Sequence, residues 1–125
     1  VVEPTPGGIA PGLKGERRFV VSDAMVTRHA GGGGVLTTPS MIAAMEATAE
    51  EVTRPLLPAE HTTVGYEVAV RHRAPTALGM SFTVTAELVE VTGRRLLFLV
   101  SARNERETIV EGTHRRTVIR LGALT

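Results

Sequence analysis

Apolar residues recur with a helical period in the first half of the chain and alternate with polar residues in the second half. At roughly 100° per residue, six apolar side chains fall on one continuous arc: Met41, Ile42, Met45, Ala49, Val52 and Leu56. This arc predicts an amphipathic helix that begins within Thr37-Thr38-Pro39-Ser40 and runs to about Leu57. A hydroxyl residue can cap that start, and proline fits the first helical turn because no N–H is needed there.

From residue 64 onward, apolar side chains alternate with polar ones, which is typical of half-buried strands. We predict strands over 64–72, 82–88, 96–102 and 108–121, with a hairpin turn at Thr92-Gly93. A first strand is expected over Arg17–Ser22, ahead of the helix. The order of strand, helix and about four strands predicts an α+β fold with a mostly antiparallel sheet.

Two segments rich in glycine or proline flank the first strand. Residues 1–15 contain three prolines and several glycines, so we expect a flexible arm there and a single domain over residues 16–125. Four consecutive glycines, 31–34, precede the helix. They predict a mobile or tightly bent loop, because glycine adopts backbone conformations that other residues avoid.

Composition narrows the classes of partner. The chain has 125 residues, and its 14 Lys and Arg against 13 Asp and Glu give a net charge of +1. This balance provides no field for nucleic acid or an anionic membrane surface, so we expect neither partner. The chain has no cysteine, which excludes a thiol nucleophile and a thiolate metal site. It also favours a cytoplasmic location. The histidines show no metal-ligand spacing, and we expect no metal.

Three residues stand where chemistry is possible, although each also has a structural interpretation. Thr38 lies at the helix N-terminus, where free N–H groups can hold an oxyanion, or where it simply caps the helix. Glu46 lies at the edge of the apolar arc and is either a base or a glutamate that reaches solvent. His72 ends the strand over 64–72 and is either catalytic or structural. Taken singly, each residue favours the structural interpretation.

The joint pattern is more specific than any one residue. The stretches TTPSMIAAME (37–46) and VGYEVAVRH (64–72) resemble the hot-dog thioesterases, and within them the fluoroacetyl-CoA thioesterase-like group. Short matches in the later strands, including GRRL (93–96) and GTH (112–114), extend the similarity over roughly residues 14–121. In that family, a threonine opening the central helix, a glutamate eight residues later and a histidine ending the next strand form the active site. Thr38, Glu46 and His72 match these positions.

The resemblance carries further expectations. It implies a hot-dog fold, in which the sheet wraps around one long helix, and a homodimer with active sites at the subunit interface. It implies hydrolysis of an acyl-CoA thioester, with CoA entering as part of the substrate and no separate cofactor. Gly65 matches a glycine associated with the acyl pocket. Arg71 and Arg73, with Arg94 and Arg95, are candidates for the CoA phosphates, the alternative for each being a solvated surface arginine.

Two other functions remain open from the sequence. One is a non-catalytic protein that binds acyl-CoA or a hydrophobic ligand in the same fold. The other is a hot-dog hydratase or dehydratase, which we rank last because no aspartate stands a few residues before a histidine on the helix. The segment 30–36 is also shorter than the phenylalanine-bearing lid of the fluoroacetyl-specific enzymes. We therefore expect the hydrolytic residues without selectivity for a fluorinated acyl group.

Overall fold

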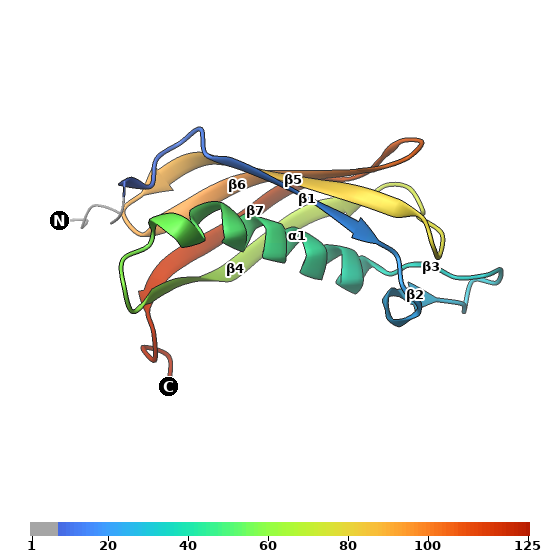
Figure 1. The fold of residues 1–125 in the computed structure, drawn as a ribbon, viewed down its shortest axis with the longest axis horizontal. Helices are drawn as coiled ribbons and strands as arrows, with labels where there is room; N and C mark the ends of the chain where they lie inside the picture. The colour runs from blue at the N-terminus through green and yellow to red at the C-terminus, as the bar shows by residue number, and fades with distance from the viewer. Residues whose placement is uncertain (1–7) are drawn as a thin grey trace.

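One long helix, α1 (Thr38–Thr53), packs across one face of a five-stranded antiparallel sheet (Figure 1). The computed structural model describes residues 8–125. The strands lie side by side as β1 (Lys14–Val20), β5 (Ser81–Thr92), β6 (Arg95–Asn104), β7 (Thr108–Arg120) and β4 (His61–His72). Every neighbouring pair is antiparallel. The α+β class and the mostly antiparallel sheet expected from the sequence are confirmed.

The core forms between α1 and the alternate residues of the sheet that point toward it. These buried side chains are Phe82, Val84, Ala86 and Leu88 in β5 and Leu96, Phe98, Val100 and Ala102 in β6. The helix contributes Met41, Ala44, Met45 and Ala49. The alternation predicted for these strands is therefore the alternation between core and outer face.

The helix ends earlier than its apolar arc predicts. It stops at Thr53 and continues as a 3₁₀ turn, η3 (Arg54–Leu56), rather than as α-helix to Leu57. Pro55 explains the difference, because proline has no N–H to donate to the preceding turn and its ring clashes with the carbonyl four residues back. Leu56 is half-buried against the core, so its apolar side chain fits the arc without being helical.

The folded body begins before the expected boundary at residue 16. Strand β1 begins at Lys14, and Ile9 is buried in the core. Backbone hydrogen bonds join Gly12 N–H to the Leu88 carbonyl and Leu88 N–H to the Leu13 carbonyl, each at 2.8 Å. Residues 9–15 of the expected arm are thus part of the folded body, while residues 1–7 lie outside the described part.

A small ribbon precedes the helix. A 3₁₀ turn, η2 (Asp23–Met25), leads into β2 (Val26–Thr27), which pairs with β3 (Val35–Leu36). The glycine segment joins these two strands, and three of its residues, Gly31, Gly32 and Gly34, have positive φ angles. The expected tight bend is therefore present, in conformations that favour glycine. Within residues 8–125, no helix has the length and apolarity needed to cross a membrane.

Candidate active site

Thr38 and His72 meet at one end of the molecule. Thr38 is the first residue of α1 and His72 the last of β4, and the Thr38 hydroxyl lies 2.8 Å from His72 Nδ1. The cap of the helix is the preceding residue, Thr37, whose hydroxyl accepts a hydrogen bond from Ser40 N–H at 3.2 Å. Thr38 is thus not the cap that its position also allowed, and its hydroxyl is available to the imidazole. We call Thr38 and His72 the mouth pair.

The His72 imidazole is suited to accept a proton from Thr38. Burial lowers the pKa of His72, and the nearby backbone of Ala74 opposes this shift in part. The ring is therefore neutral near pH 7, since an ordinary imidazole already titrates at about 6.5. Its second nitrogen, Nε2, is buried and has no hydrogen-bond partner among residues 8–125. A neutral imidazole beside a hydroxyl is the arrangement that activates a hydroxyl nucleophile.

Glu46 does not join the mouth pair within one chain. Eight residues separate it from Thr38, which is about 12 Å along the helix axis. Its carboxylate oxygen Oε2 lies 3.9 Å from Arg116 Nη1 and 4.0 Å from His114 Nε2, and its side chain is 41% exposed. The sequence-predicted trio is therefore divided between two places, with Thr38 and His72 in contact and Glu46 about two turns farther along α1.

Gly65 has no side chain, and this leaves room for the Glu46 carboxylate beside β4. A Cβ atom on Gly65 would lie 2.8 Å from Glu46 Oε2 and 2.7 Å from His114 Cε1. Both distances are shorter than non-bonded atoms tolerate, so a larger residue would displace one of these groups. We call Glu46, Gly65, His114 and Arg116 the inner cluster.

The sequence interpretation missed two members of the inner cluster. His114 entered it only as part of the GTH match over 112–114, and Arg116 was not singled out. The structure buries both side chains, His114 completely. The signal that could have found them is the alternation in β7, which puts His114 and Arg116 on the same face as the buried Val110 and Val118.

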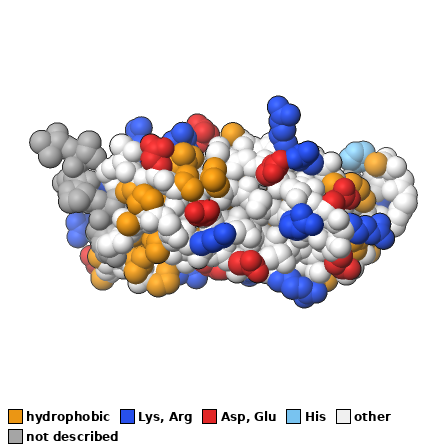
Figure 2. Space-filling model, turned by 90° about the horizontal axis from the view of Figure 1, so that it is seen from above, with side chains coloured by type: hydrophobic (Ala, Val, Ile, Leu, Met, Phe, Trp, Pro, Cys, Tyr) orange, Lys and Arg blue, Asp and Glu red, His pale blue; other side chains and the backbone are white. Residues whose placement is uncertain are grey.

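The candidate phosphate-binding arginines lie at two ends of β4: Arg71 and Arg73 flank His72, whereas Arg95 pairs with Thr117, which lies opposite Val64. Arg71 is exposed on β4, and Arg73 follows the end of that strand and forms an ion pair with Glu111. The Arg95 guanidinium lies 6.0 Å from the centre of the Tyr66 ring. Figure 2 shows basic and acidic side chains interspersed over the face it displays, without one continuous basic patch.

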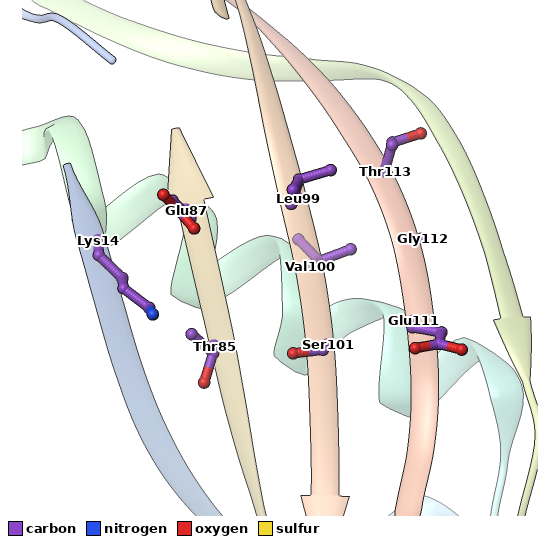
Figure 3. A pocket seen from close by; sticks show the side chains of 9 residues that line it. All are labelled: Lys14, Thr85, Glu87, Leu99, Val100, Ser101, Glu111, Gly112 and Thr113. Atoms are coloured by element: carbon purple, nitrogen blue, oxygen red, sulfur yellow. The ribbon is translucent and has the colours of Figure 1, made fainter. Parts of the chain in front are cut away.

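Two hollows lie in different parts of the molecule. One, of about 270 Å³, is lined by Val35, Leu36, His72, Arg73, Ala74 and Pro75, and so adjoins the mouth pair. The other, of about 480 Å³, is lined by nine residues of β1, β5, β6 and β7 on the face turned away from α1 (Figure 3). The second contains neither the mouth pair nor the inner cluster, so its size does not mark it as the reactive site.

Comparison with known proteins places this geometry in a family. A family model described as fluoroacetyl-CoA-specific thioesterase (FlK) matches residues 20–121, a range that includes the mouth pair and the inner cluster. The chain belongs to the FlK family. Fluoroacetyl-CoA thioesterase of Streptantibioticus cattleyicolor is 40% identical over 87 residues, which are 70% of this chain and 63% of that protein. The match therefore spans less than two thirds of this FlK relative.

Solved structures agree with this assignment. A structure of the fluoroacetyl-CoA thioesterase FlK superimposes with a TM-score of 0.87 at 34% identity, covering 94% of this chain and 93% of that one. A hot-dog-like protein from Thermanaerovibrio acidaminovorans gives a TM-score of 0.84 at 22% identity, over 93% of this chain and 87% of that one. The second likeness concerns the fold alone. The hot-dog fold expected from the sequence is thereby confirmed for this member of the FlK family.

Proposed function

We propose that this chain hydrolyses an acyl-CoA thioester to a free acid and CoA, using Thr38, Glu46 and His72. The observation that carries the proposal is the 2.8 Å contact between the Thr38 hydroxyl and a neutral His72 imidazole, in a chain of the FlK family. The contact stands at the N-terminus of α1, where the positive end of the helix dipole favours the oxyanion formed when a thioester carbonyl is attacked.

The mouth pair supports a two-step reaction. Thr38 Oγ1 attacks the carbonyl carbon while its proton passes to His72. The C–S bond then breaks, CoA leaves as a thiol with the proton from His72, and the acyl group is held as an ester on Thr38. Water attacks that ester while a base takes one water proton. The ester C–O bond then breaks, that proton is returned to Thr38 Oγ1, and the free acid leaves. Glu46 is the proposed base for the water.

Glu46 can reach that water if two copies of the chain pair through β4. This strand has twelve residues and, among the described strands, pairs only with β7, which leaves its other edge open. Residues 65–69 of β4 are exposed, with Tyr66 at 47% and Val68 at 37%. A long exposed edge with apolar side chains is a template for another strand. We therefore propose a homodimer joined edge to edge through β4.

The pairing has a consequence for the site. In an antiparallel pair of β4 strands centred on Val68, residue 72 of one copy lies opposite residue 64 of the other. His72 of one copy would then lie beside Gly65 of the second copy, against which Glu46 rests. The mouth pair of one copy and the inner cluster of the other would form one site at the interface. This arrangement accounts for the separation of Glu46 from Thr38 within a single chain.

The arginines at the end of β4 are proposed to contact the CoA phosphates. Arg71 and Arg73 flank His72 in sequence, so a thioester held at Thr38 has its CoA portion within reach of them. Arg71→Ala is expected to raise KM for acyl-CoA with little change in kcat. An unchanged KM in a variant that also replaces Arg73 would remove both arginines from substrate binding.

The activity is tested by thiol release from a panel of acyl-CoA substrates, including fluoroacetyl-CoA, acetyl-CoA and longer aliphatic ones. We expect turnover by the purified protein and losses of about 10²- to 10⁴-fold in Glu46→Ala and His72→Ala. Two matched controls are Glu50→Ala on the same helix, where Glu50 pairs with Arg54, and His61→Ala at the opposite end of β4. Undiminished turnover in Glu46→Ala and His72→Ala would remove both residues from the mechanism, and saturable binding without thiol release would favour a binding protein.

The nucleophile is tested by trapping the intermediate. Rapid acid quench of a reaction with Glu46→Gln is expected to leave the acyl mass on the protein, because the ester forms and its hydrolysis slows. Thr38→Val is expected to carry no such mass. An adduct that persists in Thr38→Val and vanishes in Glu46→Gln would instead make Glu46 the nucleophile. Light scattering measures the oligomeric state, and a monomer at working concentrations would contradict the shared site.

A further inference from the structure

Beside the Glu46 carboxylate, β4 and β7 bury three polar side chains next to one another: Thr63, His114 and Arg116. We propose that Thr63 and His114 fix the Arg116 guanidinium, and that Arg116 in turn positions the Glu46 carboxylate for the reaction. This inference rests on the proposed function, because it assigns positioning residues to a carboxylate that the proposal makes catalytic.

Arg116 is held by three hydrogen bonds from its own side chain. Its Nε donates to the Thr63 hydroxyl at 2.9 Å, and Nη2 donates to the Thr63 carbonyl at 2.9 Å. Its Nη1 donates to His114 Nε2 at 3.2 Å. With these donors engaged, the planar guanidinium has one orientation rather than a set of rotamers.

The buried cation requires a negative partner, and the structure supplies Glu46. Only 7% of the Arg116 side chain is exposed, and burial of a charge is costly without a counter-charge. Burial lowers the pKa of Arg116, while the charges of Glu46 and Glu50 raise it. Glu50 is already bound by Arg54, which leaves Glu46, at 3.9 Å from Nη1, as the carboxylate beside the guanidinium.

His114 acts as a neutral acceptor in this arrangement. Its Nδ1 lies 2.9 Å from the Glu67 carbonyl and donates to it, so Nε2 carries the lone pair that receives Arg116. Burial lowers the pKa of His114, and the neighbouring Arg116 charge lowers it further. The 4.0 Å approach of His114 Nε2 to Glu46 is therefore not an ion pair. The ring fixes Arg116, and Arg116 faces the carboxylate.

Gly65 completes the geometry from the side of β4. A side chain at this position would occupy the space of Glu46 Oε2, and its Cβ would also lie 3.3 Å from Arg116 Nη1. The glycine therefore allows the carboxylate to lie against the guanidinium. A carboxylate held in this way has less freedom to rotate, and small misplacements of a catalytic group cost large factors in rate.

The test removes one hydrogen bond to Arg116 without touching Glu46. Thr63→Val keeps the shape of the side chain but removes the acceptor of Nε. We expect kcat for acyl-CoA hydrolysis to fall about 10-fold with KM within about twofold, since an orienting contact and not a substrate contact is lost. Thr63→Ser restores the hydroxyl and is expected to restore kcat. The matched control is Thr62→Val. Thr62 directly precedes Thr63 on β4, and its side chain lies on the other face of the sheet.

A double-mutant cycle separates positioning from a purely structural role. If Thr63 acts through Arg116 and Glu46, Thr63→Val has no further effect on kcat in a Glu46→Gln background. Equal losses in both backgrounds would overturn the proposal, as would a wild-type kcat in Thr63→Val or a change confined to KM. Should Thr63→Val fail to fold, His114→Gln, which keeps an acceptor for Arg116, is compared with His114→Leu in the same cycle. The proposal then requires the larger kcat loss in His114→Leu, and this loss must vanish in the Glu46→Gln background.

Failure of the proposed function looks different. In that case, the unmodified protein releases no thiol from any acyl-CoA. Turnover by the wild type with no coupling between Thr63 and Glu46 would overturn the positioning role alone.

Discussion

The mouth pair and the inner cluster hold their polar side chains in opposite ways. At the mouth, Thr38 is exposed at a helix end and makes one direct hydrogen bond to His72. In the inner cluster, His114 and Arg116 are buried, and the Glu46 carboxylate lies 3.9 to 4.0 Å from them over a glycine. A reacting hydroxyl must be reachable by substrate, whereas a group that orients another gains from rigid surroundings. The contrast predicts that substitutions at the mouth affect mainly turnover, and those in the inner cluster affect stability as well.

The largest effect is expected at the mouth. Thr38→Val keeps the size of the side chain and removes the hydroxyl that contacts His72. We expect kcat to fall about 10²- to 10⁴-fold. The free energy of unfolding should change by less than about 0.5 kcal/mol, because Thr38 does not cap the helix. Thiol release and denaturant unfolding measure the two quantities. Normal turnover in Thr38→Val, or a destabilisation as large as that of a core substitution, would contradict the expectation that the mouth pair affects mainly turnover.

A smaller effect on rate, joined by a loss of stability, is expected in the inner cluster. Gly65→Ala places a Cβ 2.7 Å from His114 Cε1 and 2.8 Å from Glu46 Oε2. The carboxylate or the strand must shift, and we expect a cost of about 1–3 kcal/mol in unfolding together with reduced kcat. The control is Gly33→Ala, because Gly33 has no positive φ and its Cβ would contact nothing within 4 Å. Equal behaviour of the two alanine variants would contradict the close packing at Gly65.

The same contrast explains which parts of the site could be predicted from sequence. The mouth pair and Glu46 lie on a helix and a strand with clear periodicity, and the resemblance to the hot-dog thioesterases at these positions singled out all three as candidates. The helix N-cap could not be assigned from sequence, because either Thr37 or Thr38 can cap a helix. Only the tertiary contact of Thr38 with His72 distinguishes them. Arg116 was missed because an arginine in a strand normally faces solvent.

The limits of the fold prediction have similar physical causes. The helix end was extended because the apolar arc continues through Leu56, although Pro55 stops the α-helical hydrogen bonds. The segment 9–15 was expected to be an arm because of its glycines and prolines. Its packing depends on Ile9 and on hydrogen bonds to Leu88, which are contacts between positions distant in sequence. Hydrophobic periodicity and the positions of glycine and proline report local structure, so they do not reveal contacts between segments distant in sequence.

A third substitution tests whether Thr37 caps the helix while Thr38 serves the reaction. Thr37→Ala removes the hydroxyl that accepts the Ser40 N–H. Loss of an N-cap costs about 1 kcal/mol, and we expect this change in the free energy of unfolding measured with denaturant. The effect on kcat should be smaller than that of Thr38→Val, because the hydroxyl beside His72 remains. The reverse order, with Thr38→Val less stable and Thr37→Ala less active, would exchange the roles of the two residues.

The last and smallest effect concerns pH, and it compares the two regions through their histidines. Burial lowers the pKa of both His72 and His114. At His114 the hydrogen bond to the Glu67 carbonyl and the Glu46 charge oppose this shift in part, while the Arg116 charge adds to it. An unfolded chain titrates these groups at about 6.5, so below that pH it binds more protons than the folded chain. The free energy of unfolding should therefore fall as pH decreases from about 7.5 to 5.5, and these two groups should contribute no slope above that range.

Because His114 is completely buried and lies beside a cation, His114→Gln should flatten this dependence more than His72→Gln. Denaturant unfolding across the pH range measures each slope. A wild-type slope in the double variant would show that other groups set the pH dependence, and a greater flattening in His72→Gln would show that the mouth desolvates its histidine more than the inner cluster does.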